Sequence, residues 1–318
     1  MPAKRIELGG ISFPGILCAP LAGYTDFAFR RLCYSFGAGM CFTEMVSAKG
    51  LFYNSTATRE LLVQAPEEKG RTAVQLFGSD PDCMRLACES EDLKDFPAAD
   101  LNMGCPVPKV YKNGEGSALL GNMPLAEKII AACVKSGKIV TVKFRIGLRR
   151  DSPVAAEFAR MCEGAGASMI TVHGRPRESY YSGEPDYGQI AAAKEAVKIP
   201  VIANGGIFSP EDGQKMLDRT GADGVMLARG ALQNPHLFAE FAGAGKKWDI
   251  PGAVRAQAAD MLPVYGEKRT VVHMRKMAAF YIRGLRGASE ARQKLFECAT
   301  MGEVEAVLAP VLAGGKGD

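Results

Sequence analysis

Short apolar runs recur along residues 16–228, and an amphipathic stretch follows each of them. None of the runs alternates strictly between apolar and polar residues, which is typical of strands buried on both faces of a parallel sheet. The pattern predicts eight strands, at residues 16–19, 40–43, 72–75, 98–102, 140–144, 169–172, 201–203 and 224–228.

The amphipathic stretches predict a helix after each strand. Four of them begin with a capping residue followed by proline, at Asp80, Ser152, Ser209 and Asn234. This pair favours a helix start, because the side chain can accept a hydrogen bond from the first turn and proline is tolerated there. The predicted helices cover residues 27–36, 81–93, 124–135, 153–164, 187–196, 209–219 and 235–241, with a short, poorly defined helix near 55–62.

Eight strand–helix units in a row are typical of a (β/α)8 TIM barrel, an α/β fold. The alternative, a doubly wound open sheet, would normally carry a GxGxxG motif after a strand near one end, and no such motif occurs. The last quarter of the chain lacks strand patterns and predicts helices. We therefore expect a catalytic barrel at residues 1–242 and a small C-terminal helical domain at residues 243–318.

The composition is that of a soluble globular protein with a large core, since 47% of the residues are hydrophobic. No apolar run reaches the length of a membrane span, and the N-terminus lacks the apolar stretch of a secretory signal. The nine cysteines form no CxxC pair, and the three histidines are far apart in sequence. These features predict a cytoplasmic protein with reduced thiols and without a metal site.

The charge is unevenly distributed along the chain. Residues 1–242 contain 27 Lys and Arg against 27 Asp and Glu, whereas residues 243–318 contain 12 against 8. Arg269, Lys276 and Arg283 are spaced by seven residues, so a continuous helix would place them on one face. A basic surface on an otherwise neutral protein favours contact with an RNA backbone.

Strand after strand of the predicted barrel ends in a hydrogen-bonding or charged side chain. Active sites of TIM barrels lie at this carboxyl end of the strands. Amide, ammonium, imidazole, guanidinium and thiol groups suit a polar ring system and a phosphate. The residues at the strand ends are Gln75, Asn102, Cys105, Lys143, Arg145, His173, Arg175, Asn204 and Arg229.

Two glycine-bearing loops follow the seventh and eighth strands, at residues 204–206 and 228–230. In barrels these two loops commonly form a phosphate site, because glycine lets backbone N–H groups approach the anion. Lys143 lies in an apolar run, which disfavours a surface position. A lysine at such a position would stabilise the negative charge that develops on the pyrimidine side of a reduced flavin.

The stretches that carry this chemistry resemble the tRNA-dihydrouridine synthase family of flavin-dependent enzymes. Each motif alone is weak, but together they follow the order found in that family, and the tail around residues 274–284 is similar to its helical domain. The matching stretches are residues 19–26, 43–47, 74–78, 101–106, 142–145, 171–175, 202–206 and 226–230.

The resemblance implies a barrel that binds FMN, takes electrons from NADPH and passes a hydride from the reduced flavin to C6 of a uracil in tRNA. It implies that Cys105 is the general acid that protonates C5, which agrees with a thiol pKa of about 8.5. Substrate contacts are implied for Asn102, Arg145 and Arg175. Cofactor contacts are implied for Pro20, Leu21, Ala22, Gln75, Lys143, His173, Asn204, Gly205, Gly206, Ala228, Arg229 and Gly230.

Three other functions stay open. The first is an FMN oxidoreductase that acts on a free small pyrimidine and resembles dihydroorotate dehydrogenases, which would not need a basic tail. The second is dihydrouridine synthesis on an RNA other than tRNA. The third is a non-catalytic RNA-binding relative, which would not need Cys105 or the flavin contacts. The leading hypothesis is a tRNA-modifying enzyme that is a monomer without an implied protein partner.

Overall fold

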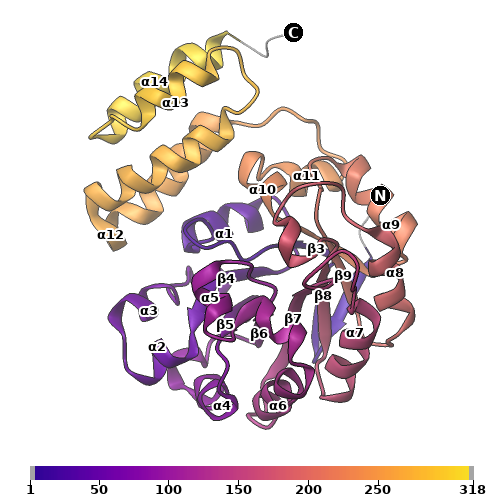
Figure 1. Ribbon diagram of the computed structural model, residues 1–318. Helices are drawn as coiled ribbons and strands as arrows, with labels where there is room; N and C mark the ends of the chain where they lie inside the picture. Colours follow the sequence, from indigo (N-terminus) through magenta and orange to yellow (C-terminus); the bar gives the residue numbers. More distant parts are fainter. Residues whose placement is uncertain (1–3, 315–318) are drawn as a thin grey trace.

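The computed structural model describes residues 4–314, and eight parallel strands close into a barrel at its centre (Figure 1). β10 pairs with β3, so the sheet has no free edge. The predicted TIM barrel is therefore confirmed, and the open doubly wound sheet is excluded. Around the barrel the strands are β10 (Gly224–Leu227), β3 (Ile16–Cys18), β4 (Cys41–Ser47), β5 (Thr72–Phe77), β6 (Ala98–Met103), β7 (Ile139–Arg145), β8 (Met169–His173) and β9 (Val201–Asn204).

Helices form an outer layer around these strands (Figure 1). The short helix expected near residues 55–62 is α3 (Thr56–Glu60), and α2 (Ala48–Phe52) precedes it. The other helices of this layer are α1 (Phe27–Ser35), α4 (Pro81–Glu89), α5 (Pro108–Lys112), α6 (Met123–Val134), α7 (Ala155–Gly164), α8 (Tyr187–Glu195), α9 (Pro210–Thr220), α10 (Arg229–Gln233) and α11 (Leu237–Phe241).

Two of the four predicted helix caps are confirmed and two are wrong. Asp80 and Ser209 each accept a hydrogen bond from a first-turn N–H, of Cys83 and Asp212 respectively. Ser152 does not cap a helix, because Pro153 forms an extended bridge with Gly147 and α7 begins two residues later. Asn234 ends α10 instead of beginning α11, and its side-chain amide donates to Glu240 at 2.7 Å.

An apolar cluster fills the amino-terminal half of the barrel interior. An antiparallel hairpin of β1 (Arg5–Leu8) and β2 (Ile11–Pro14) belongs to the same cluster, and so it covers this end of the barrel. This hairpin was not predicted from the sequence. The buried members of the cluster are Ile6, Leu8, Phe13, Leu17, Ala19, Met40, Phe42, Ala73, Ala98, Met169, Ile202 and Met226.

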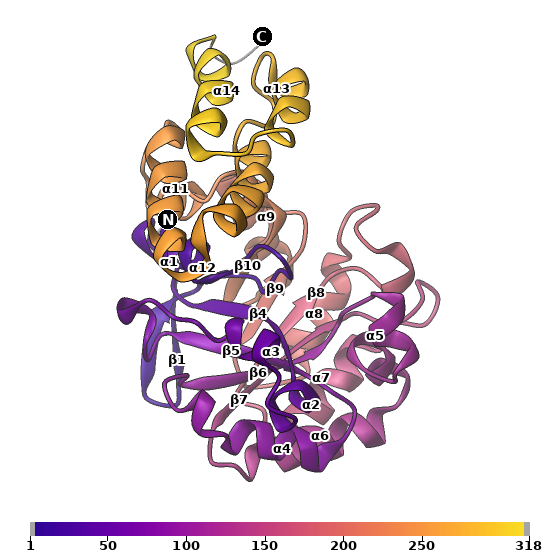
Figure 2. The ribbon, with the colours of Figure 1, turned by 90° about the vertical axis from the view of Figure 1, so that its left-hand side faces the viewer.

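The C-terminal region is helical, as predicted, and consists of α12 (Ile250–Tyr281), α13 (Ala288–Leu295) and α14 (Met301–Ala313). These three helices stand beyond the barrel, and α12 is the one that lies next to α1 (Figure 2). α12 contacts both α1 and α10, and Gly266 interrupts it with a φ of 72°. No helix among residues 4–314 combines the length and apolarity that a membrane span requires.

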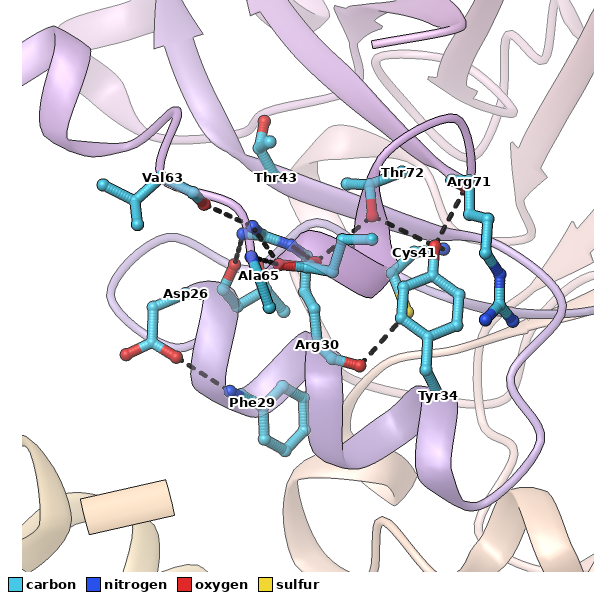
Figure 3. A network of polar contacts seen from close by, with 12 residues as sticks. Asp26, Phe29, Arg30, Tyr34, Cys41, Thr43, Val63, Ala65, Arg71 and Thr72 are labelled. Atoms are coloured by element: carbon cyan, nitrogen blue, oxygen red, sulfur yellow. Dashed lines mark hydrogen bonds and ion pairs between the residues drawn. The ribbon is translucent and has the colours of Figure 1, made fainter. Parts of the chain in front are cut away.

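A buried ion pair connects α1 to the segment before β5 (Figure 3). Arg30 donates to both carboxylate oxygens of Glu68, at 2.6 and 3.2 Å, and neither side chain is exposed to solvent. Arg30 also donates to the carbonyls of Thr25 and Val63, and Glu68 accepts from the backbone N–H of Ala65. Every nitrogen of the guanidinium is therefore paired, which a buried charge requires.

Removing one partner of this pair should destabilise the fold strongly. We expect Arg30→Met to lower the free energy of unfolding by about 3–5 kcal/mol, because it leaves the carboxylate of Glu68 buried without its cation. Urea denaturation followed by circular dichroism measures this change. Arg85→Met removes a solvent-accessible pair with Glu89 and should cost about 0–1 kcal/mol. Equal losses in the two variants would contradict the structural role of Arg30.

Candidate active site

A cavity of about 640 Å³ opens at the carboxyl ends of the strands. This volume is typical of sites for small molecules and cofactors. Residues from the ends of all eight strands, or from the loops directly after them, form its wall. The sequence-predicted residues on this wall are Pro20, Leu21, Ala22, Gln75, Asn102, Cys105, Lys143, Arg145, His173, Arg175, Asn204, Gly205, Gly206, Ala228, Arg229 and Gly230.

The wall of the cavity is strongly cationic. Lys143, Arg145, Arg175 and Arg229 line it, and no Asp or Glu does so among the described residues. Burying like charges together without a counter-ion is costly. The cavity is therefore suited to an anionic ligand.

Lys143 is the cation at the base of this cavity. Its Nζ donates to Asn204 Oδ1 at 3.1 Å, and it forms no ion pair in the described part of the chain. Burial, with a smaller contribution from the charge of Arg145, lowers the pKa of Lys143 to about 8. An anion beside Nζ would restore the charged form.

Arg145 holds two loops in place at the cavity wall. Its Nε donates to the carbonyl of Gly104 at 2.9 Å, next to Cys105, and its Nη1 donates to the carbonyls of Tyr180 and Pro176. Burial lowers the pKa of Arg145 to about 10, so it remains charged at neutral pH. The loops after β6 and β8 are thus connected through one side chain of β7.

Arg175 and His173 lie side by side at the end of β8. Arg175 donates to the carbonyl of Gly183 at 2.7 and 3.0 Å, and its Nη1 lies 3.4 Å from His173 Nε2. Burial and the surrounding cations lower the pKa of His173 well below its usual value. His173 is therefore a neutral imidazole at physiological pH and can accept as well as donate a hydrogen bond.

The two glycine loops approach each other closely. Gly205 and Gly206 have φ angles of 124° and 70°, a region that glycine adopts without strain. A Cβ on Gly230 would lie 2.2 Å from the backbone oxygen of Ile207, so no larger residue fits there. Arg229 lies over the ring of Tyr181, with 4.8 Å between the guanidinium carbon and the ring centroid.

Cys105 lies in the loop after β6, and backbone contacts hold it there. Asn102 Oδ1 accepts hydrogen bonds from the N–H groups of Cys105 and Gly104, at 2.9 and 3.2 Å. Ser117 donates to the carbonyl of Cys105 through its hydroxyl at 2.8 Å. Burial raises the pKa of the half-buried thiol above its ordinary value. The thiol is therefore protonated at neutral pH.

The aromatic part of the cavity wall was not predicted from the sequence. Phe280 of α12 lines the cavity and packs edge-to-face against Tyr24, with 5.4 Å between the ring centroids. Aromatic residues in the predicted loops were the available signal in the sequence, but only the fold shows that they face one cavity. The other missed residues with large side chains are Met45, Tyr180, Tyr181, Ile207, Phe208, Met226 and Leu232.

The three basic tail residues lie outside this cavity and do not share one helix face. Arg269 pairs with Glu60 of α3 at 2.8 Å, and Lys276 Nζ donates to the carbonyl of Gly23 at 3.1 Å. α12 ends at Tyr281, so Arg283 follows the helix and does not extend its face. Two of the three side chains therefore connect α12 to the barrel.

The closed barrel and its cationic cavity define a TIM-barrel protein with a binding site at the carboxyl ends of the strands. Residues 17–313 match the model of the dihydrouridine synthase (Dus) family. tRNA-dihydrouridine synthase B of Pseudomonas aeruginosa is 36% identical over 298 residues, which cover 90% of each chain. The chain belongs to the dihydrouridine synthase family.

Other similar proteins agree with this assignment. Probable tRNA-dihydrouridine synthase 1 of Synechocystis sp. is 36% identical, over 99% of this chain and 91% of the relative. Among solved structures, morphinone reductase has a TM-score of 0.57 and 15% identity, over 80% of this chain and 94% of that chain. 2-Naphthoyl-CoA reductase has a TM-score of 0.60 and 11% identity, over 76% and 52%. These two structures share the barrel fold.

Removing the unpaired charge of Lys143 should stabilise the protein in its ligand-free form. The pKa of Lys143 is about 8 in the fold and about 10.4 in the unfolded chain. Below pH 8 the lysine is charged in both states and the full cost of burial is present, whereas this cost disappears as pH rises toward 10.4. We expect Lys143→Met to raise the free energy of unfolding by roughly 1–2 kcal/mol at about pH 6.5 and by less at about pH 9.5.

The measurement is urea denaturation of ligand-free protein at the two pH values. Lys135→Met, which removes an exposed lysine at the end of α6, is the matched control and should leave the stability unchanged at both. A loss of stability in Lys143→Met would show that Lys143 is not an uncompensated charge.

Proposed function

We propose that this chain reduces uridines in tRNA to 5,6-dihydrouridine, with FMN as the bound cofactor and NADPH as the reductant. One observation carries the proposal: a protonated thiol, Cys105, and an unpaired ammonium, Lys143, face the same cavity, which has no acidic residue on its described wall. The names of the similar proteins from Pseudomonas aeruginosa and Synechocystis sp. support the same reaction.

The residues of the cavity fit FMN. Its phosphate needs an anion site, and the loops at residues 204–206 and 228–230 offer glycine backbone and the guanidinium of Arg229. Its ring system gains negative charge on the pyrimidine side, where Lys143 would compensate it. When bound, the flavin accepts electrons from a nicotinamide and delivers a hydride to a carbon of the substrate.

Cys105 supplies the proton in this proposal. The uracil gains a hydride at C6 and a proton at C5, so the C5–C6 double bond becomes a single bond and the thiol becomes a thiolate. Arg145 and Lys143 lie close enough to lower the pKa of the thiol in part against the effect of burial. They therefore stabilise the thiolate that remains after proton donation, until it regains a proton from solvent.

RNA is a better substrate for this site than a free pyrimidine. Residues 243–318 carry the whole positive excess of the chain, and Phe280 from the same region forms part of the cavity wall. A base must leave its stack to enter a cavity of this kind, at a cost of a few kcal/mol. Backbone contacts along the basic region would offset that cost. A free pyrimidine would require neither feature.

The visible spectrum of the purified protein tests this function. With anaerobic protein, we expect a flavin band that NADPH bleaches and that unmodified tRNA restores. In Cys105→Ala the bleaching by NADPH should be unchanged, whereas recovery with tRNA should be about 100- to 10,000-fold slower, the usual contribution of a general acid. Stopped-flow absorbance measures the two half-reactions separately.

Cys83→Ala is the matched control, because Cys83 is a free cysteine that does not line the cavity. It should behave as the wild type in both half-reactions. Recovery with a free pyrimidine but not with tRNA would favour the small-molecule alternative. A protein that cannot take up FMN would exclude the proposed enzyme function.

We further propose that Arg269, Lys276 and Arg283 contribute to the RNA-binding surface. Arg269 is more than half exposed although it pairs with Glu60, and Arg283 is exposed beyond the end of α12. Lys276 is partly buried and donates to the carbonyl of Gly23. It would therefore contact RNA only at the junction of α12 and the barrel.

Changing all three residues to Glu should weaken tRNA binding and flatten its salt dependence. Each lost phosphate contact lowers the slope of log affinity against log salt by about one. Filter binding at several salt concentrations measures both effects. Arg160→Glu, the same charge reversal on an exposed position of α7, is the control and should change neither. Unchanged affinity at low salt in the triple variant would count against this surface.

A further inference from the structure

A polar layer lies directly beneath the floor of the cavity. Gln75, Asp100 and Thr141 are register partners on the neighbouring strands β5, β6 and β7. Gln75 lines the cavity, whereas Asp100 is fully buried and does not reach it. Asp100 is thus a buried carboxylate in the barrel interior that neither lines the cavity nor takes part in the proposed reaction.

Asp100 accepts two hydrogen bonds and orients the side chains that donate them. Its Oδ1 accepts from Thr141 Oγ1 at 2.6 Å, and its Oδ2 accepts from Gln75 Nε2 at 2.7 Å. An ionised carboxylate can only accept, so it selects the orientation of the Gln75 amide in which the nitrogen faces Asp100.

This orientation continues toward the Cys105 loop. Because Gln75 Nε2 faces Asp100, Gln75 Oε1 is free to accept from Asn102 Nδ2, at 2.8 Å. Asn102 Oδ1 is then free to accept from the backbone N–H of Cys105. If the Gln75 amide turned over, its NH2 group would oppose the NH2 group of Asn102. Turning Asn102 in response would place that NH2 group against the N–H of Cys105.

The same orientation determines what the two amides offer to a ligand. Gln75 and Asn102 both line the cavity, and each has one N–H that these hydrogen bonds do not use. Both residues are therefore set to donate to carbonyl oxygens, which uracil and the pyrimidine side of a flavin both carry. Asp100 fixes this orientation at the Gln75 end, and the backbone N–H groups of Gly104 and Cys105 fix it at the Asn102 end.

We propose that Asp100 is a positioning residue that fixes the amide orientation of Gln75 and Asn102 and, through them, the backbone of Cys105. This inference rests on the proposed function, since it assigns the oriented donors and the thiol to the reduction of a uracil ring. Asp100 touches neither substrate nor cofactor and acts only through the two amides.

The protonation state of Asp100 makes this chain of hydrogen bonds depend on pH. Burial, only partly offset by the two hydrogen bonds and the charge of Lys143, raises the pKa of Asp100 to about 6. Lys143 on β7 is the charged group that acts on it from the neighbouring strands, and it is still protonated at this pH. Below pH 6 the carboxyl becomes a donor as well, and the selection of one amide orientation is lost.

The test compares Asp100→Leu with the wild-type holoenzyme. Leucine removes the buried carboxylate together with its desolvation cost, but it also leaves the donors of Gln75 and Thr141 without their acceptor. We expect a modest loss of stability in urea, an altered absorption spectrum of bound FMN, and a reaction of the NADPH-reduced enzyme with tRNA that is about 100-fold slower. The decline in this rate below pH 6 should be present in the wild type and absent in the variant.

A second readout does not depend on the cofactor. In FMN-free Asp100→Leu, iodoacetamide should alkylate Cys105 faster than in the wild type, because Asp100 no longer holds Asn102, the acceptor for the N–H of Cys105, through Gln75. Mass spectrometry of the peptide that contains Cys105 gives this rate. An unchanged alkylation rate together with an unchanged rate with tRNA would overturn the inference.

Thr141→Val is the matched control, because it removes the other donor to Asp100 and leaves the bond to Gln75 in place. It should keep wild-type kinetics, and a loss equal to that of Asp100→Leu would overturn the inference. Should Asp100→Leu fail to fold, Asp100→Asn decides, because its amide can turn either atom toward Gln75. A reaction with tRNA slower than in Thr141→Val supports the inference, and an equal rate overturns it.

If reduced wild-type enzyme does not react with tRNA, the proposed function itself fails. The alkylation rates of FMN-free protein still separate that failure from a failure of the Asp100 inference. Faster alkylation in Asp100→Leu than in Thr141→Val would retain the link between Asp100 and the Cys105 loop. Equal rates in these two variants would remove it.

Discussion

Closure of a parallel barrel imposes the main constraint on this protein, because it brings all eight strand ends to one face and leaves an interior that must be filled. The chain meets this constraint with a change of polarity along the barrel axis. Methionine, phenylalanine and aliphatic side chains fill the amino-terminal half, where the β1–β2 hairpin covers them. Above them come the buried polar partners Gln75, Asp100 and Thr141, and then the cationic cavity.

Because of this change of polarity, the residues that stabilise the fold and the residues of the candidate active site lie in different halves of one barrel. The apolar half and the Arg30–Glu68 pair can hold the fold without any ligand, since their contacts are complete. The half at the carboxyl ends of the strands contains charged groups without an ion-pair partner among the described residues, chiefly Lys143. A protein that keeps such a cation buried accepts a cost in the empty state, and binding of an anion recovers it.

The strands could be predicted from the sequence because buried strands have a recognisable apolar pattern. The cavity residues could be predicted because closure of a barrel determines where the strand ends lie. Most of the apolar runs end in a polar residue, and closure alone gathers these ends, as it does for Gln75, Lys143 and Asn204. What depended on distant partners could not be predicted. Pro153 is extended because it pairs with Gly147, and Lys276 contacts Gly23 because α12 packs against the barrel. Spacing along the chain contains neither fact.

The contact of α12 with the loop after β3 has a consequence for how such proteins diverge. Glu44 of β4 accepts from the N–H of Gly23, Lys276 of α12 donates to its carbonyl, and Phe280 reaches the cavity beside Tyr24. The helical region is thus also a wall of the cavity. A chimera that joins this barrel to the tail of a relative would exchange part of that wall, so the two regions have to evolve as a matched pair.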